Sequence, residues 1–146
     1  MQYWLFKSEP SEWSWQAQLA KGVSGEEWNG VRNYQARNFM REMAVGDLGF
    51  FYHSQKEKAV VGIVEVCAAS HPDSTTDDPR WECVDIRAIR PFVRAVTLDE
   101  IKAEPALAEM VLVRNSRLSV QPVTAAEWDR ICEMGMTDPG GSPSTG

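Results

Sequence analysis

The sequence predicts an α+β fold: a small mixed β-barrel of five to six strands with short helices at its periphery. Three observations favour this class. With 146 residues, the chain suits one domain built around one core. Its apolar segments are short, and several alternate with polar residues as half-buried strands do. The pattern lacks long strand–helix–strand units, which disfavours a doubly wound parallel sheet.

Three strands and two helices are predicted in the first half of the chain. Residues 3–6 form an apolar run typical of a short buried strand, and residues 11–21 suit a short helix. Residues 34–43 indicate an amphipathic helix, because apolar side chains recur at i, i+3, i+4 and i+7. These side chains are Ala36, Phe39, Met40 and Met43. Residues 48–53 are rich in aromatic side chains and residues 59–67 in branched ones, so both are predicted strands.

One strand and two helices are predicted from local signals in the second half. Apolar and polar residues alternate over residues 84–88, as in a half-buried strand. Two threonines each stand three residues before a glutamate. In this capping box, both side chains satisfy free backbone N–H groups where a helix begins. The predicted helices cover residues 98–103 and 125–134. The two motifs are Thr97-x-x-Glu100 and Thr124-x-x-Glu127.

The end of the predicted domain follows from two short apolar runs and a polar tail. Residues 110–113 and 117–120 are predicted to be the closing strands of the barrel. From residue 135 the chain is dominated by small and turn-forming residues that cannot bury a core. We therefore expect a folded domain over residues 1–134 and a disordered tail over residues 135–146.

The charge of the chain argues against tight, sequence-blind binding to nucleic acid. The formal net charge is -6 and the pI is about 4.9, whereas such binding depends on neutralising phosphates. The charges are unevenly distributed, however. Residues 29–41, 86–96 and 111–126 contain eight arginines and no acidic residue. An acidic protein with this distribution can present one basic face, and we predict that it does.

The cysteines and the N-terminus predict a cytoplasmic protein. Cys67, Cys83 and Cys132 are odd in number and unevenly spaced, which favours a reducing compartment over a disulfide framework. The first residues lack the features of a signal peptide. No run of 18 apolar residues occurs, so neither a transmembrane helix nor a membrane partner is expected.

Metal, cofactor and catalytic motifs find little support in the sequence. The two histidines, His53 and His71, have no partner at a metal-ligand spacing. The glycine-rich motifs that bind phosphates or dinucleotides are missing, and so is the nucleophile elbow of serine hydrolases. We therefore expect no metal, no cofactor and no catalytic residue. Two alternatives stay open: an enzyme that acts on a small nucleotide with His53 as general base, and a protein-interaction module.

Residues 28–38 are the most informative segment, because they combine aromatic rings with amide and guanidinium groups and contain no acid. Buried hydrogen-bonding groups would each need a partner, and a solvated surface would not need the rings. The mixture suits a pocket that stacks a flat polar ligand and reads its edges. Trp28 is predicted either to stack on that ligand or to anchor the loop. Trp4 and Trp128 are assigned to the core, and Trp81 suits either role.

Five sequence blocks, in this order, resemble the EVE domain family. They are Tyr3–Pro10, Trp28–Arg41, Phe50–Ser54, Trp81–Asp85 and Arg117–Val123. The resemblance covers about residues 1–134. It implies a β-barrel of the PUA-like superfamily, related to YTH domains, with a pocket for a modified nucleobase.

The resemblance and the residue chemistry together predict a set of site residues. The ligand-binding set is Lys7, Ser8, Trp28, Asn33, Tyr34, His53, Ser54, Arg117 and Ser119. The phosphate-contacting set is Arg32, Arg37 and Arg117. We expect non-catalytic binding of a modified base, in DNA or RNA, in an aromatic-walled pocket flanked by arginines. We also expect a monomer, although the sequence does not define the oligomeric state.

Overall fold

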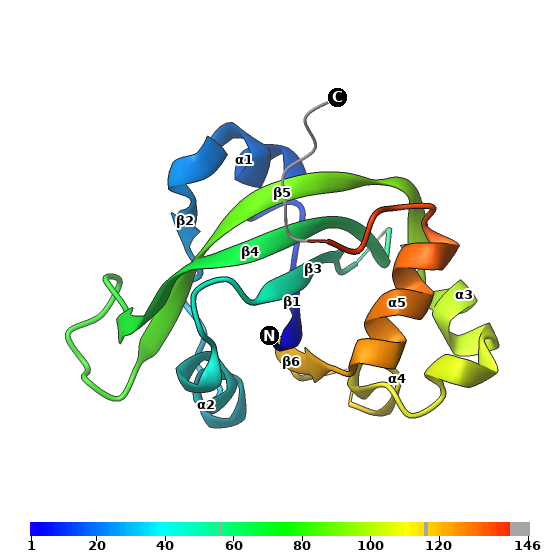
Figure 1. Cartoon of the computed structure of the whole chain (residues 1–146). Helices are drawn as coiled ribbons and strands as arrows, with labels where there is room; N and C mark the ends of the chain where they lie inside the picture. The colour runs from blue at the N-terminus through cyan, green and yellow to red at the C-terminus, as the bar shows by residue number, and fades with distance from the viewer. Residues whose placement is uncertain (56, 116, 141–146) are drawn as a thin grey trace.

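A mixed six-stranded sheet crosses the molecule in this computed structural model, which describes residues 1–55, 57–115 and 117–140 (Figure 1). The strand order is β2-β5-β4-β3-β1-β6, with β1 parallel to β3 and the other neighbours antiparallel. The strands are β1 (Tyr3–Ser8), β2 (Glu26–Glu27), β3 (Leu48–His53), β4 (Ala59–Pro72), β5 (Glu82–Thr97) and β6 (Val120–Val123). The mixed sheet is confirmed, but β2 and β6 stand at opposite ends of its order, so the sheet is not closed into the predicted barrel.

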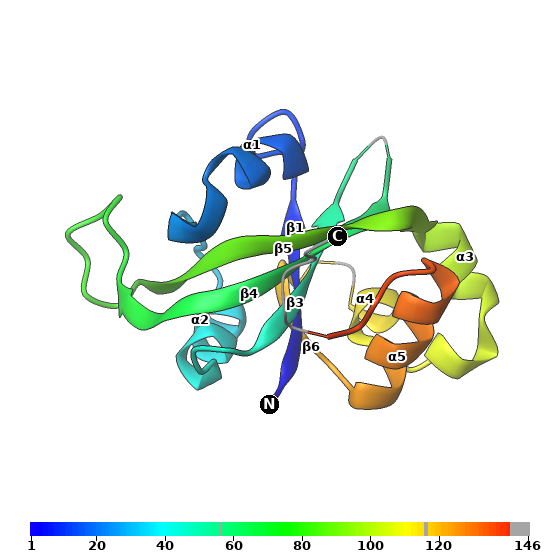
Figure 2. The same ribbon diagram turned by 45° about the horizontal axis from the view of Figure 1, so that its top comes forward.

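Short helices surround the sheet, as predicted. They are α1 (Trp15–Ala20), the 3-10 turn η1 (Gly22–Ser24), α2 (Tyr34–Glu42), α3 (Leu98–Ala103), the 3-10 turn η2 (Pro105–Leu107), α4 (Val111–Arg114) and α5 (Ala125–Met134). Both capping boxes form, and α3 and α5 have the predicted bounds. Figures 1 and 2 show α3, α4 and α5 gathered at one end of the sheet, away from α2.

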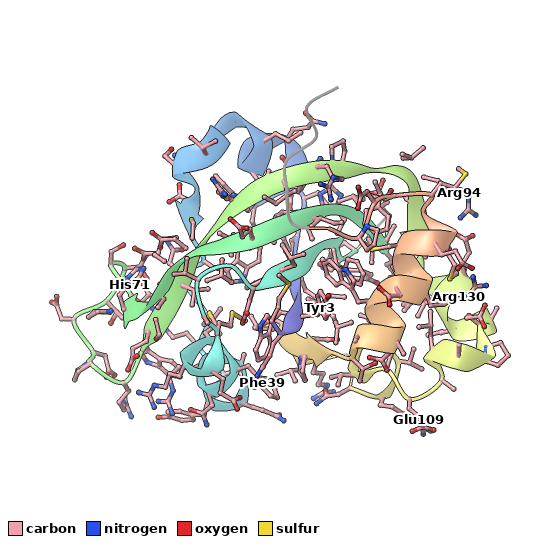
Figure 3. The ribbon with its side chains drawn as sticks, viewed as in Figure 1. Tyr3, Phe39, His71, Arg94, Glu109 and Arg130 are labelled. Atoms are coloured by element: carbon pink, nitrogen blue, oxygen red, sulfur yellow. The ribbon has the colours of Figure 1, made fainter. Side chains whose placement is uncertain are left out.

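The two faces of the sheet each carry a hydrophobic core, which explains why β1 is almost entirely apolar. Leu5 belongs to the core beside α5, whereas Trp4 and Phe6 belong to the core beside α2. In the first core, the Trp128 ring stacks on Phe50 and on Tyr3, with centroids 4.0 and 4.5 Å apart; Tyr3 is labelled in Figure 3. Because successive side chains of a strand point to opposite faces, a strand buried on both sides cannot alternate.

The β4–β5 hairpin is longer than the apolar pattern predicts. The predicted strand over residues 59–67 extends to Pro72, and the one over residues 84–88 covers Glu82–Thr97. Several register shifts bend this ladder, and its far end projects beyond the core (Figure 1). Polar contacts hold this end of the hairpin in place. Residues in such contacts do not produce a hydrophobic period in the sequence, so the full length of the two strands was not predicted.

Two strand predictions near the C-terminus need correction. Residues 110–113 are not a strand: α4 forms there, with the N–H of Arg114 donating to the carbonyl of Met110 at 3.0 Å. Short apolar runs suit either structure, so periodicity could not decide. The strand predicted over residues 117–120 lies instead at Val120–Val123, where it pairs with β1.

The contacts of the chain continue beyond the predicted domain end at residue 134. The Thr137 hydroxyl accepts from the Val93 N–H at 2.9 Å, and the Trp128 indole donates to the Pro139 carbonyl at 3.1 Å. Residues 135–140 therefore lie against the body of the domain rather than forming part of the predicted tail. Residues 141–146 lie outside the described residues. Within the described part, none of the helices has the length and apolar character needed to span a bilayer.

Candidate functional site

A cleft of about 650 Å³ opens where the ends of β1 and β3 meet β2 and the loop that follows β2. Its lining combines two indole rings with polar side chains. The described lining residues are Lys7, Ser8, Glu9, Glu12, Trp13, Glu26, Glu27, Trp28, Asn29, Gly30, Val31, Arg32, Ser54 and Ser119. Four carboxylates face two cationic side chains here, so the cleft itself is not basic.

Trp28 is both a wall of this cleft and a member of the core. Its ring meets Phe6 and Phe51 edge to face, with centroids 5.4 and 5.7 Å apart, and only 9% of the residue is exposed. Its backbone N–H donates to the Val84 carbonyl at 2.8 Å. The two roles predicted as alternatives, ligand wall and loop anchor, are therefore compatible in geometry.

Trp13 is the second aromatic residue of the cleft, and it is missing from the predicted site. The sequence assigned it to the first helix, but that helix begins only at Trp15. The Trp13 indole donates to Gln18 Oε1 at 2.9 Å, and its carbonyl accepts from the Ser8 hydroxyl. Its place in the short segment between the end of β1 and the start of α1 was the signal that could have revealed it.

Four predicted site residues come together at the end of the sheet. The Lys7 N–H donates to the Ser119 carbonyl, and the Ser54 N–H donates to the Ser8 carbonyl, both at 2.9 Å. These bonds bring the ends of β1 and β3 and the segment before β6 to one rim of the cleft. Burial lowers the pKa of the Lys7 ammonium group.

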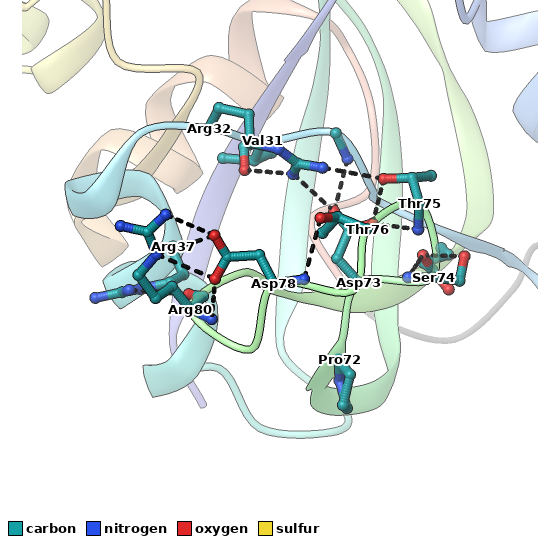
Figure 4. A network of polar contacts seen from close by, with 12 residues as sticks. Val31, Arg32, Arg37, Pro72, Asp73, Ser74, Thr75, Thr76, Asp78 and Arg80 are labelled. Atoms are coloured by element: carbon teal, nitrogen blue, oxygen red, sulfur yellow. Dashed lines mark hydrogen bonds and ion pairs between the residues drawn. The ribbon is translucent and has the colours of Figure 1, made fainter.

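The tip of the β4–β5 hairpin holds the opposite wall through Asp73 (Figure 4). This carboxylate is buried; it accepts from the Gly30 N–H at 2.9 Å and from Arg32 Nη1 at 3.1 Å. It also accepts from the Thr75 N–H at 2.8 Å. Gly30 has φ of 79°, a left-handed conformation that favours glycine. Burial alone would raise the pKa of Asp73, but the hydrogen bonds outweigh it and lower the pKa to about 2.

A second contact joins the same hairpin tip to β2. Glu27 Oε1 accepts from the Ser74 N–H at 2.9 Å and from the Ser74 hydroxyl at 2.8 Å. The wall from Glu27 to Arg32 is therefore attached to the hairpin at both ends. The neighbouring Glu26 pairs with Lys21 at 3.0 Å, and that contact lowers the pKa of Glu26.

Four residues of the predicted site do not line this cleft. Asn33 is the N-cap of α2, where its side-chain oxygen accepts from the Ala36 N–H at 2.9 Å. Tyr34 stacks on Trp81 outside the cleft, with ring centroids 4.9 Å apart. Arg117 is exposed, and its described hydrogen bond is made by its backbone N–H, which donates to Asn115 Oδ1.

His53 is the fourth, and its hydrogen bonds matter for the enzyme alternative. Nε2 accepts from the Trp15 N–H at 3.0 Å, so the ring proton lies on Nδ1, which is 2.7 Å from Glu57 Oε1. The lone pair that a general base needs is thus occupied by the backbone of α1. The ring lines a separate hollow of about 550 Å³ with Pro10 and Gln55.

The predicted phosphate contacts differ in their pairing. Arg32 forms an ion pair with Asp73, whereas the described hydrogen bonds of the Arg37 side chain go to neutral oxygens of Asn38 and Arg80. Among residues 1–55, 57–115 and 117–140, no carboxylate makes an ion pair with Arg37 or Arg117. These two arginines are therefore better placed than Arg32 to neutralise a phosphate.

One group of potential metal ligands among the described residues includes Glu27 of the cleft wall. Donor atoms of Glu27, His71 and Cys83 lie within 4.8 Å of one another. His71 also contacts Asp85 through Nε2 at 2.7 Å and the Pro72 carbonyl through Nδ1 at 3.0 Å. Burial alone would lower the pKa of His71, but these acceptors raise it, and burial raises the pKa of the Cys83 thiol. The three residues come from separate strands, so the group could not be predicted from a spacing of metal ligands in the sequence.

Comparison with known proteins first defines the class of fold, which is an α+β fold. A YTH domain of Zygosaccharomyces rouxii, solved with N6-methyladenosine RNA, matches in fold with a TM-score of 0.58 at 17% identity over 92% of this chain and 86% of that one. The EVE domain model matches residues 2–134, and the chain belongs to the EVE domain family.

Two further relatives are similar over nearly the whole chain. A protein of Agrobacterium tumefaciens is 56% identical with a TM-score of 0.95, covering 99% of both chains. Human thymocyte nuclear protein 1 is 36% identical over 94% of this chain and 75% of its own length. Human THYN1 in complex with 5-methylcytosine-containing DNA superimposes with a TM-score of 0.88 at 33% identity, covering 95% of this chain and 100% of that one.

The name of the human relative contradicts the predicted cytoplasmic location. It describes a nuclear protein. The cysteine pattern cannot separate the two locations, because the nucleus, like the cytoplasm, is a reducing environment.

Proposed function

We propose that this protein binds a modified nucleobase of DNA or RNA in the cleft and does not catalyse a reaction on it. The observation that carries this proposal is the convergence of Trp13 and Trp28 with the polar ends of β1 and β3 in one cleft. A volume of about 650 Å³ lies within the usual range for small-molecule sites. The complex of human THYN1 with 5-methylcytosine-containing DNA supports the choice of ligand class.

The charges in the cleft suit a base better than a phosphate. An anion would be repelled by the four carboxylates of Glu9, Glu12, Glu26 and Glu27. A base is uncharged, and its N–H groups can donate hydrogen bonds to these carboxylates. The phosphates of the strand would then stay outside, where Arg37 and Arg117 have no carboxylate partner among the described residues. Arg32 would contribute less, because Asp73 already neutralises it.

This arrangement requires a base that has left its stack. Removing a base from a duplex costs roughly a few kcal/mol, and a single strand avoids most of that cost. In the cleft, stacking on an aromatic side chain contributes roughly 1–3 kcal/mol per base. We therefore propose that the protein binds a modified base more tightly in a single strand than in a fully paired duplex.

The test compares labelled single-stranded oligonucleotides that differ only in one 5-methylcytosine or cytosine. Fluorescence anisotropy should show tighter binding of the modified strand. Trp13→Ala should weaken that binding roughly 5- to 150-fold. Val93→Ala is the control, because this side chain is exposed on β5 and does not line the cleft. Equal affinity for both strands, or equal behaviour of the two variants, would contradict the proposal.

The same samples distinguish binding from turnover. Mass spectrometry of the recovered oligonucleotide should show an unchanged mass after long incubation. A changed base that depends on His53 would instead support the enzyme alternative.

A further inference from the structure

We infer that Tyr34, Trp81 and Arg37 form a second contact for the same strand, which binds the unpaired nucleotide next to the base in the cleft. The inference rests on the proposed function and specifies its partner more closely. Tyr34 would stack on the flanking base, and Arg37 would hold its phosphate. We call these three residues the stacking surface.

The first observation is an exposed aromatic ring that the fold does not need for its core. Tyr34 is 49% exposed at the first turn of α2, whereas the buried residues of that helix are Ala36 and Met40. The Tyr34 ring lies nearly parallel to Trp81, at an interplanar angle of 23°. The two rings come from distant segments of the chain: Tyr34 begins α2, and Trp81 lies directly before β5. An exposed aromatic ring can serve as a stacking face for a base.

The second observation is a guanidinium group that the rings hold in place without neutralising it. Arg37 lies 4.8 Å from the Tyr34 centroid and 6.0 Å from that of Trp81. Its Nη1 donates to the Arg80 carbonyl at 2.9 Å. The contrast with Arg41 on the same helix is clear, because Arg41 Nη2 pairs with Glu82 at 2.8 Å.

The third observation is that the stacking surface continues from the cleft. Arg32 lines the cleft, and its guanidinium lies 5.4 Å from the Trp81 ring centroid. Asp73 holds Arg32 in this position, as Figure 4 shows. A strand that leaves the cleft past Arg32 therefore meets the aromatic rings next. Successive nucleotides of one strand rise by only about 3.4 Å in a duplex and reach further when unstacked.

The chemistry of these residues selects a nucleic-acid strand as the occupant. An aromatic ring offers a stacking face to any base, and a guanidinium without a carboxylate offers charge and hydrogen bonds to a phosphate. A purely structural stack would attach the hairpin tip to α2 but would not require an arginine that makes no ion pair with a described carboxylate. Because the flanking base must leave its own stack to reach Tyr34, the surface favours an unpaired neighbour.

The experiment measures two ligands against three variants. The ligands are 5-methyl-2′-deoxycytidine, which reaches only the cleft, and a single-stranded oligonucleotide with one 5-methylcytosine, which reaches both surfaces. The variants are Tyr34→Ala, Arg37→Gln and the control Arg41→Gln. Tyr34→Ala should weaken oligonucleotide binding roughly 5- to 150-fold. Arg37→Gln should reduce the slope of log K against log salt by about 0.7. Neither variant should change nucleoside affinity.

Each outcome separates this inference from the proposed function. If the wild-type protein binds the nucleoside and oligonucleotide binding is the same in all three variants, the inference is wrong and the cleft proposal stands. If the wild-type protein binds neither ligand, the proposed function fails for this base. Tyr34→Phe guards against a folding artefact, since it keeps the ring and loses only the contact with Arg80; it should bind the oligonucleotide like the wild type.

Discussion

Replacement of Asp73 by asparagine tests whether the hairpin tip holds the wall of the cleft. The carboxylate is 2% exposed and accepts hydrogen bonds from Gly30, Arg32 and Thr75. An asparagine has one acceptor oxygen and places an amino group opposite these donors. We expect the Asp73→Asn variant to be less stable and to bind the oligonucleotide more weakly, because the Gly30–Arg32 segment loses its anchor.

The size of the stability loss follows from the pKa of Asp73. Lowering this pKa from its ordinary value of 3.8 to about 2 means that the folded state favours the ionised form. At about 1.4 kcal/mol per unit, the ionised carboxylate stabilises the fold by about 2 kcal/mol. Because the side chain is buried, solvent screening reduces this figure little. We therefore expect Asp73→Asn to lower the free energy of unfolding by about 2 kcal/mol at pH 7.

The pH dependence has a definite sign. A carboxyl group with a lowered pKa contributes its full stability above the unfolded pKa of 3.8. The contribution falls as the pH drops from there toward about 2, where the folded carboxyl group is itself protonated. The difference between wild type and Asp73→Asn should thus be constant from pH 7 to pH 5 and smaller at pH 3.

The assay is urea unfolding at several pH values, with Asp78→Asn as the matched control. Asp78 lies in the same hairpin tip and also has a pKa lowered to about 2, through its hydrogen bonds with Arg80. That contact joins residues two apart near the solvent, so it can persist in the unfolded chain. Asp78→Asn should leave the urea midpoint unchanged. An equal midpoint for Asp73→Asn and wild type at pH 7, or a difference that does not shrink in acid, would refute the reasoning.

Three further predictions concern the core, the helix caps and the thiols. Trp28→Ala should lower the free energy of unfolding by roughly 3–5 kcal/mol, and its folded fraction should bind the modified oligonucleotide more weakly; wild-type stability in urea would remove Trp28 from the core. Thr97→Ala and Thr124→Ala should each cost about 1 kcal/mol through lost capping, and circular dichroism melts that match the wild type would contradict this. A thiol reagent should modify Cys67 before Cys83, because Cys83 is fully buried and burial raises its pKa; the opposite order by mass spectrometry would contradict this.

Local signals predicted the elements that local contacts stabilise. The capping boxes set where α3 and α5 begin, because their hydrogen bonds span only three residues. The far half of the β4–β5 hairpin was not predictable in this way. It depends on contacts such as Asp73 with Gly30, which lie 43 residues apart and leave no period in the sequence. The helix α4 was not predictable either, because its four apolar or basic residues suit a strand equally well.

The predicted site residues lie together in the cleft only where residue type and position in the chain both pointed to the same place. Lys7 and Ser8 lie at one rim of the cleft because the parallel register of β1 and β3 aligns the ends of these strands. Asn33 was assigned to the ligand because amides read base edges, but an asparagine before a helix also caps it, and the structure shows the cap. Trp13 was missed because the residues before a helix start carry no periodic signal.

The pairing of the arginines bears on how an acidic protein could bind nucleic acid as proposed. Most described arginines are already paired with carboxylates; these are Arg32, Arg41, Arg80, Arg87, Arg94, Arg114 and Arg130. The predicted basic face is therefore much smaller than the arginine distribution suggests, and few phosphates can be neutralised. Under the proposed function, affinity that cannot come from phosphates would come from the base, through Trp13, Trp28 and the polar rim. Such a protein would bind weakly to unmodified strands, because without the fitting base little would remain to hold the backbone.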